Sequence, residues 1–328
     1  MKVKRFLSIF LILLMLLCVF VSCENPKMPS VIEEWTDGNS DTSSTQGGKE
    51  TTNGNATEGN NGDNGNSSES GNNGSDSSDI GIGDYLYFGE YPQTLKAIDV
   101  TVSETADSRG YYLGSDNCCY AKVAAKPYQA GYKLSDGTTT VKSNSVYYFK
   151  VEPIKWRIVS KNGNEAVLIC ESAIDAKRFD DDLNNYEASE IRAWLNGEFV
   201  KLAFSESEIS SILDSEVDNS ASTTATQTNS YACNNTRDKV LLVSYQDALG
   251  YSSNALRAKR ASDYAVACGA WVSTADGYYG NAMWLLRSPS NIANHFVCYC
   301  DQYGDLNDGG TALSSTFFGI TPSIKIKL

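Results

Sequence analysis

The stretch "YYFKVEPIKWRIVSKNGNEAVLICESA", residues 147–173, contains two alternating apolar runs on either side of "KNGN". Alternation of apolar and polar residues is typical of half-buried strands. An Asn-Gly pair between two such runs is a strong signal for a tight antiparallel turn. The sequence therefore predicts a β-hairpin that turns at Asn162-Gly163.

Helices and further strands are expected after this hairpin. In "SEIRAWLNGEF", Ser189 is the expected N-cap and Gly197 the expected end, and in "SESEISSILDSEV", Ser205 and Glu208 form a capping box. "TRDKVLLVSY" predicts a strand, "ASDYAVACG" a short helix closed by Gly269, and "MWLLRSP" a buried strand. The end, "GITPSIKIKL", alternates with period two. Because helices lie between antiparallel-looking strands, we expect an α+β fold.

The N-terminus has the order of an export signal. A basic start precedes an apolar run, Phe6 to Val21, which is shorter than the roughly 20 residues that span a bilayer. Ser22 and Cys23 follow, and "FVSC" resembles a bacterial lipoprotein box. We expect a lipoprotein signal peptide over residues 1–22, palmitate-type lipidation of Cys23, and attachment to a membrane through this lipid. A signal anchor, or a secreted protein with an incidental Cys23, are the alternatives.

Residues 23–79 are expected to form a disordered tether rich in Asn, Gly and Ser. From Thr36 to Asp79 there is no Trp, Tyr, Phe, Leu, Ile or Val, so this part cannot bury enough apolar surface to order itself. The whole chain has a net charge of −13. A nucleic-acid partner is disfavoured, because phosphate binding needs clustered Lys and Arg.

Residues 80–328 have the composition of a globular domain rich in Tyr and β-branched residues. Cys18 and Cys23 precede this part, so seven of the nine cysteines lie in it, without a repeating spacing. We expect mostly buried thiols rather than a disulfide framework.

Motifs for catalysis are missing from the sequence. His295 is the one histidine of the chain, so Ser-His-Asp and Cys-His sites would both need it. No Gly-x-Ser-x-Gly, phosphate-binding or dinucleotide motif is present. Cys298-Tyr-Cys300 and Cys118-Cys119 lack the spacing of zinc ligands. We expect no catalysis, no cofactor and no metal site.

The stretch "HFVCYCDQYGDLNDGG", residues 295–310, resembles a metal or redox site at first sight. Alternation places Phe296, Cys298 and Cys300 on one face of a strand, and His295, Val297, Tyr299 and Asp301 on the other. Small apolar thiols beside an aromatic are typical of a protein interior. The expected buried framework is Cys298, Cys300, Leu306, Leu313 and Ile320.

Between these framework positions lie Tyr, Asp, Asn, Thr, Ser and Phe side chains. Such residues on loops that a rigid scaffold holds are suited to recognition, although ordinary solvated loops have the same composition.

Several of the quoted stretches together resemble a known family. "YFGEYPQT", "VEPIKWRIV", "SEIRAWLNGEF", "DKVLLVSY", "WLLRSP" and "GITPSIKI", with the lipoprotein-like start and the tether, are similar to the Treponema variable proteins. These are surface lipoproteins with a C-type-lectin-like fold that is shared with formylglycine-generating enzymes, and a diversity-generating retroelement rewrites adenines in codons near the C-terminus. The resemblance implies this fold for residues 80–328, with a variable region at about 284–328.

The resemblance also implies a binding site for a macromolecule, a protein or a glycan. The expected contacts are Ile292, Asn294, His295, Phe296, Tyr299, Asp301, Tyr303, Asp305, Asn307, Asp308, Thr311, Ala312, Ser314, Ser315, Phe317 and Phe318. Rewriting adenines in Asn-type codons cannot yield Lys, Glu, Gln, Met or Trp. Residues 290–319 contain only Gln302 from that set, whereas residues 80–289 use all five types.

Departures from the family pattern keep two other functions open. Thr321 stands where related domains often have Arg, and the calcium-site signatures of sugar-binding lectins are absent. The formylglycine-generating relatives bind copper through a cysteine pair, for which Cys298 and Cys300 are the nearby candidates. A copper oxidase of this type and a structural envelope lipoprotein are therefore the alternatives.

Overall fold

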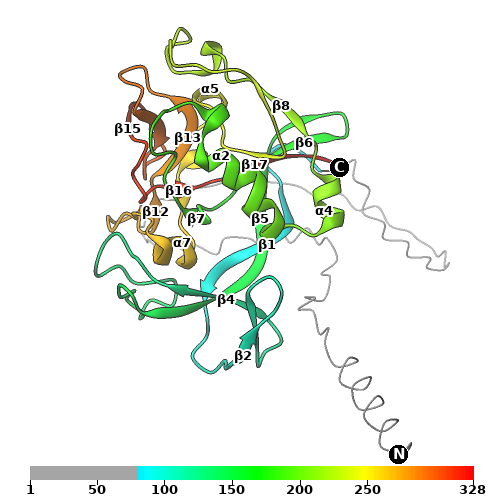
Figure 1. Ribbon diagram of the computed structural model, residues 1–328, viewed down its shortest axis with the longest axis vertical. Helices are drawn as coiled ribbons and strands as arrows, with labels where there is room; N and C mark the ends of the chain where they lie inside the picture. Colours follow the sequence, from blue (N-terminus) through cyan, green and yellow to red (C-terminus); the bar gives the residue numbers. More distant parts are fainter. Residues whose placement is uncertain (1–79) are drawn as a thin grey trace, which may run out of the picture. The chain divides into compact units, whose positions relative to one another are not determined.

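Residues 80–328 form a mixed α+β domain of mostly antiparallel strands with a few short helices in the computed structural model (Figure 1). The structure describes these residues only. The predicted signal peptide over 1–22, the lipidation site Cys23 and the tether over 23–79 lie outside them. Within the described part, no helix is long and apolar enough to cross a membrane.

The larger sheet has eight strands. In spatial order these are β10 (Val240–Leu241), β17 (Ser323–Lys327), β6 (Glu165–Cys170), β5 (Val146–Asn162), β4 (Cys119–Ala124), β3 (Tyr111–Gly114) and β2 (Val102–Ala106), and β1 (Tyr85–Leu95) also pairs with β5.

Strand β5 is long enough to pair with three strands. Phe149 lies opposite Ala121 of β4 and Leu95 of β1, and Trp156 lies opposite residues of β6 and again of β1. A strand has only two edges, so β4 and β6 follow one another along one edge of β5 and β1 occupies the other. The N-terminal strands are thereby joined to the same sheet as the C-terminal strand β17.

The predicted hairpin is confirmed as β5 and β6, with its turn one residue later than expected. Asn162 pairs with Glu165, so the two-residue loop is Gly163-Asn164. Gly163 takes a φ of 59°, a left-handed conformation that glycine adopts without strain.

The smaller sheet has five strands and lies beside the larger one (Figure 1). Its order is β15 (Leu306–Ala312), β14 (Phe296–Cys300), β13 (Trp284–Pro289), β16 (Gly319–Ile320) and β7 (Asp175–Ala176). All six residues of β13 are buried, as "MWLLRSP" predicts. Two further strand pairs are β8 (Ser215–Val217) with β9 (Thr236–Asp238), and β11 (Lys259–Arg260) with β12 (Asn281–Ala282).

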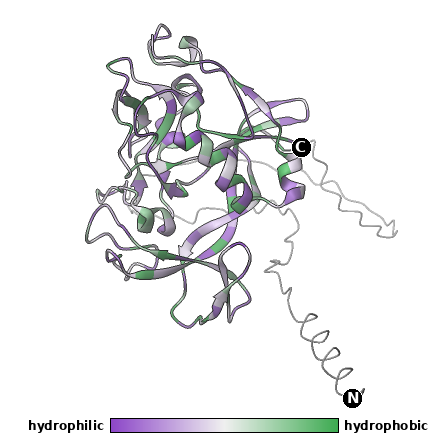
Figure 2. Cartoon of the chain, in the orientation of Figure 1, coloured by the Kyte–Doolittle hydropathy of each residue, from purple (hydrophilic) through white to green (hydrophobic). Residues whose placement is uncertain are grey.

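The core joins the two sheets through side chains that point inward. Trp284, Leu286, Cys298 and Cys300 of the smaller sheet pack with Ile169 of the larger one. Figure 2 shows hydrophobic and hydrophilic residues interspersed along most elements, as expected when one face of each element is buried. Of the seven cysteines in residues 80–328, four are buried and all are free thiols, which confirms the prediction of mostly buried thiols.

The helices are short. They are η1 (Tyr186–Ala188), α2 (Glu190–Trp194), η2 (Leu195–Phe199), α3 (Val200–Ala203), α4 (Glu206–Ser211), η3 (Ala221–Thr223), α5 (Tyr245–Leu249), α6 (Asn254–Arg257) and α7 (Asp263–Cys268). The caps at Ser189 and Gly269 and the capping box of Ser205 and Glu208 are confirmed.

The prediction that Gly197 ends a helix is wrong. The chain continues through the single π-helical turn η2 into α3. The side-chain amide of Asn196 donates to the carbonyl of Arg192, which a regular α-helix would offer to the backbone N–H of Asn196. A side chain that takes part in the helix ladder in this way is a common cause of such irregularities.

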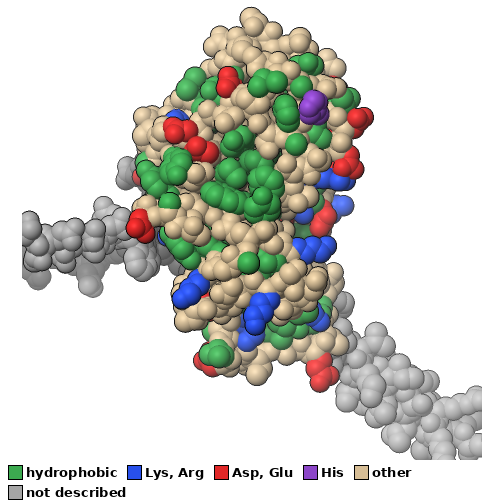
Figure 3. Space-filling model, turned by 90° about the vertical axis from the view of Figure 1, so that its left-hand side faces the viewer, with side chains coloured by type: hydrophobic (Ala, Val, Ile, Leu, Met, Phe, Trp, Pro, Cys, Tyr) green, Lys and Arg blue, Asp and Glu red, His purple; other side chains and the backbone are tan. Residues whose placement is uncertain are grey.

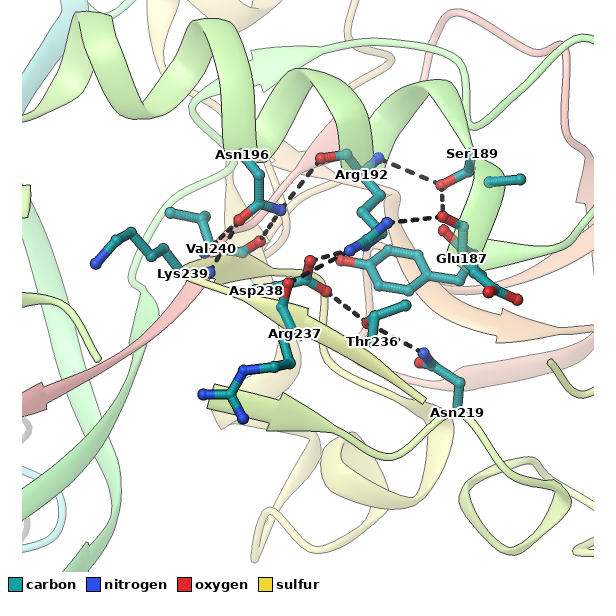
Figure 4. A network of polar contacts seen from close by, with 12 residues as sticks. Glu187, Ser189, Arg192, Asn196, Asn219, Thr236, Arg237, Asp238, Lys239 and Val240 are labelled. Carbon is teal, nitrogen blue, oxygen red and sulfur yellow. Dashed lines mark hydrogen bonds and ion pairs between the residues drawn. The ribbon is translucent and has the colours of Figure 1, made fainter. Parts of the chain in front are cut away.

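The same Asn196 side chain belongs to a polar network that fixes α2 against strands β9 and β10 (Figure 4). Its carbonyl oxygen accepts from the backbone N–H of Lys239 and of Val240, at the bend that separates β9 from β10. This bend explains why "TRDKVLLVSY" forms two strands in different sheets rather than the one expected. Arg192 donates from Nε to Asp238 at 2.7 Å, and Thr236 donates to the other Asp238 oxygen at 2.7 Å.

Replacing Arg192 by Met is expected to destabilise the domain strongly, because it leaves the buried carboxylate of Asp238 without its cation. Loss of one partner of a buried ion pair costs about 3 kcal/mol. The Asp238 side chain is fully buried and Arg192 is partly exposed. Urea unfolding followed by circular dichroism should show a lower midpoint for Arg192→Met.

The matched control is Arg178→Met, which removes an exposed ion pair with Glu190. Exposed pairs contribute about 0–1 kcal/mol, so this midpoint should move little. Equal shifts for the two variants would contradict the role assigned to Arg192.

Candidate functional site

The predicted contact residues lie on β14, β15 and the loops around them, and most of them reach the surface. Eight are exposed: Ile292, Asn294, His295, Tyr303, Asp305, Asn307, Asp308 and Ser314. Seven are half-buried: Phe296, Tyr299, Asp301, Thr311, Ala312, Ser315 and Phe317. The remaining one, Phe318, is only 2% exposed, so its predicted role as a contact is wrong. Its ring instead packs against Phe317 and Tyr299 from below the surface.

The framework expected beneath these residues is in place. Cys298, Cys300 and Ile320 are fully buried, Leu313 is 3% exposed, and Leu306 packs on the cluster that holds the two cysteines. The strict alternation expected in β14 fails at Val297, which is also fully buried. Strand β14 lies between β13 and β15 rather than at an edge, and at this position both of its faces are covered.

One end of the β14–β15 hairpin is held by Asn184, a buried residue that precedes the variable region. Its side-chain amide donates to the carbonyl of Ala293 at 3.0 Å and of Phe296 at 2.8 Å. Its backbone N–H donates to the carbonyl of Asn294 at 2.9 Å. All three acceptors are main-chain atoms, so the contacts of Asn184 do not depend on the side chains of the loop.

Arg257, which is 8% exposed, holds the other end. Its guanidinium donates to the carbonyl of Gly304 at 2.7 Å, inside the turn that joins β14 to β15. It also donates to the carbonyl of Tyr251, which ties the turn to the preceding helical segment. Gly304 has a φ of 83°, and a Cβ there would lie 2.0 Å from the carbonyl oxygen of Asn254. Any side chain at this position would therefore collide with the backbone of Asn254.

Aromatic residues outside the predicted variable region complete the surface. Tyr128 is 56% exposed and its ring lies 4.5 Å from that of Phe317, and Tyr278 packs edge-on against Tyr303 at 4.7 Å. Figure 3 shows hydrophobic side chains gathered in one patch on this face of the domain, with basic side chains beside and below it. Sequence reasoning missed these tyrosines. The Gly-flanked "DGYYG", which contains Tyr278, is the signal from which an exposed aromatic loop could have been predicted.

The cysteine pair, Cys298 and Cys300, lies inside the domain. Burial, with the nearby carboxylates of Asp308 and Asp301, raises the pKa of the Cys298 and Cys300 thiols to about 12, and metals bind the thiolate. Their sulfur atoms lie near the carbonyls of Pro289 and Arg257, at 3.5 and 3.7 Å. Among residues 80–328, no group of three or more His, Cys, Asp or Glu side chains is arranged to hold a metal ion. These two thiols act as core side chains.

Comparison with known proteins places the C-terminal half of the chain in a family. A family model described as a domain of unknown function (DUF6273) matches residues 163–328, just over half of the chain. The chain belongs to this family. The DUF6273 match begins in the β5–β6 turn. It therefore includes the whole β14–β15 hairpin and the two residues that hold its ends, Asn184 and Arg257. No curated protein and no solved structure matches the chain.

Replacing Asn184 by Ala is expected to destabilise the domain by about 2 kcal/mol, because two carbonyls lose their donor in a buried setting. Asn294→Ala makes the same chemical change at an exposed position of the same loop, and should change the stability by less than about 0.5 kcal/mol. Thermal and urea unfolding of both variants give the comparison. A larger loss for Asn294→Ala would show that the side chains of the loop, and not its backbone contacts, maintain the conformation.

Cys298 and Cys300 are expected to resist alkylation in the folded protein at pH 8. Their raised pKa keeps both thiols protonated at that pH, and neither is accessible. Cys118, which is half-buried at the surface, serves as the internal control. Peptide mass spectrometry after iodoacetamide treatment should find Cys118 modified in buffer and all three modified in urea. Modification of Cys298 at the rate of Cys118 in buffer would contradict the burial of this pair.

Proposed function

We propose that the protein is a surface-displayed ligand-binding lipoprotein of the Treponema variable protein A type, with a C-type-lectin-like fold. In this proposal Cys23 carries the lipid anchor in the outer membrane, residues 23–79 hold the domain away from the membrane, and the variable side chains bind a macromolecule without catalysis.

The observation that carries the proposal is the way the β14–β15 hairpin is held. Asn184 and Arg257 bind only main-chain carbonyls in the segments that contain the predicted contacts. Ser290 adds a third contact of the same kind, because its hydroxyl donates to the carbonyl of Asp308 at 2.8 Å. Contacts to main-chain carbonyls persist when the side chains of these segments are replaced, as a diversified binding site requires. The turn also uses the Asp301 carboxylate, which accepts from the backbone N–H of Tyr303 and of Asp305.

The composition of the exposed side chains also supports binding. Tyr and Phe offer large contact areas at a low cost in side-chain entropy, while Asp, Asn and Ser offer adaptable hydrogen bonds. The hydrophobic patch in Figure 3 gives such a surface an apolar centre, as protein interfaces commonly have. A protein or a glycan would fit this chemistry.

Two alternatives make different demands on the same residues. A formylglycine-generating-type copper oxidase requires thiolate ligands, and the buried thiols of Cys298 and Cys300 do not favour it. A structural envelope lipoprotein does not require its exposed side chains to vary. Sequence variation confined to these positions would therefore favour a receptor over a structural protein.

The gene and its surroundings provide the test. We expect a reverse transcriptase gene nearby and a template copy of the region that encodes residues 284–328. Mismatches between the gene and this template copy should fall at template adenines, in the codons of the exposed and half-buried contact residues. The codons of the framework cysteines and of Gly304 should match the template, because the structure permits no substitution there.

Sequencing several isolates of the same strain supplies the control. Codons for residues 80–283 should be identical among isolates that differ in the variable region. Mismatches spread evenly over both regions, or the absence of any template copy, would refute diversification and favour the structural lipoprotein.

A further inference from the structure

A cavity of about 720 Å³ opens beside the variable surface, between the segment around Tyr128 and the start of α2. Its walls come from residues distant in sequence, among them Lys126, Tyr128, Lys177, Arg178, Trp194 and Thr316. Only Thr316 belongs to the predicted variable region. The remaining wall is therefore part of the fixed scaffold.

The cations of this cavity are unequally neutralised. Arg178 is bound by Glu190 at 2.7 and 2.9 Å and by Asp181, so its charge is satisfied. Lys177 lies 3.6 Å from the buried carboxylate of Asp175. The exposed ammonium of Lys126 has no ion pair or hydrogen bond among the described residues. Among the described residues, Lys126 is therefore the one cation of this cavity without a carboxylate beside it, whereas Arg178 has two carboxylate partners and Lys177 has one.

The remaining titratable groups of the cavity leave the ammonium of Lys126 as its anion-binding group. Burial raises the pKa of the Asp175 carboxyl, with Lys177 and Tyr91 acting in the opposite direction, and Asp175 is the partner of Lys177. Cys268 also lines the cavity, and burial raises the pKa of its thiol well above the usual value, so it adds no negative charge. The unpaired Lys126 can therefore bind an anion here.

Trp194 gives the cavity an aromatic wall. The ammonium of Lys177 lies 4.5 Å from the centre of the Trp194 ring, a distance typical of cation–π contacts. Its buried Nε1 has no hydrogen-bond partner among the described residues, which is uncommon in folded proteins. Trp194 directly precedes the π-helical turn η2, and such turns often lie at functional sites.

The cavity and the variable surface share a border. Thr316 and Tyr128 both line the cavity. Phe317, the residue after Thr316, packs against the ring of Tyr128 in a tilted arrangement. A ligand that covers the variable surface at Phe317 can therefore place a group in the cavity without leaving the protein surface.

We propose that this cavity is a fixed subsite for an oxyanion, a carboxylate or a phosphate, carried on an aromatic or apolar group of the ligand. Lys126 and Lys177 bind the oxyanion, and Trp194 and Tyr128 contact the apolar group. The proposal rests on the proposed function in one respect, that the neighbouring surface binds the rest of the ligand. Variation then changes which macromolecule is bound, while every ligand shares an acidic group.

The test uses small probes and the full chain labelled with ¹⁵N. Phenylacetate and phenyl phosphate carry the oxyanion on an aromatic ring, and phenylacetamide is the uncharged counterpart. We expect both anions to shift the Trp194 indole resonance, assigned by its loss in Trp194→Phe, and phenylacetamide to leave it unchanged. Comparing the two anions shows whether carboxylate or phosphate is preferred.

Lys126→Gln should weaken the binding of the anions about tenfold, the effect of losing one charge-assisted hydrogen bond. Lys142→Gln, at an exposed lysine that does not line the cavity, is the control and should bind like the unmodified protein. No saturable shift at about 10 mM probe, where even millimolar affinity gives high occupancy, would overturn the subsite. Equal binding of phenylacetamide, or an unchanged affinity in Lys126→Gln, would do the same. The probes contact fixed residues, so this outcome is independent of whether a template copy exists.

Discussion

The candidate site depends on one constraint: the side chains of Asn184 and Arg257 donate hydrogen bonds to main-chain carbonyls at the two ends of the β14–β15 hairpin. A loop usually owes its conformation to its own turn residues, so changing its side chains changes its shape. Here buried side chains from other parts of the domain supply the donors. Shape and surface chemistry are thereby separated in the loop before β14 and at Gly304. Within the turn they remain linked, because the Asp301 carboxylate accepts from the backbone N–H of Tyr303 and of Asp305.

The scaffold can supply these donors because it is itself held by a branched sheet and a polar network. Strand β5 links β1, β4 and β6, which connects the N-terminal strands to the strand at the end of the chain. Arg192, Asn196 and Asp238 then fix α2 to the β9–β10 bend (Figure 4). Asn184 precedes this helix by a few residues, so the position of its amide depends on how α2 is anchored.

Local signals in the sequence predicted much of this fold. The caps at Ser189 and Ser205, and the glycine that closes α7, depend on hydrogen bonds within a few residues, and the structure confirms them. The burial of Cys298 and Cys300 followed from alternation in the same way.

Features that depend on distant contacts were not predictable. The helix continues past Gly197 where Asn196 meets Val240, and Val297 is buried because both faces of β14 are covered at this position. Phe318 belongs to the interior for a similar reason, since residues on either side of it pack over its ring. Likewise, no pattern in the sequence brings Tyr128 to Phe317 or Lys126 to Trp194, because each pair joins segments far apart in the chain.

Net charge alone gives a misleading account of the partner. A charge of −13 disfavours acidic ligands at long range, but at physiological ionic strength charges beyond about 8 Å are largely screened. An anion that has reached the cavity interacts mainly with Lys126, since Arg178 is paired with two carboxylates and Lys177 with Asp175. The acidic remainder of the surface then acts against nonspecific capture of anions, and only a ligand that also fits the adjoining aromatic surface gains from the cations. Selectivity of this kind comes from the combination of a fixed charge with a replaceable surface.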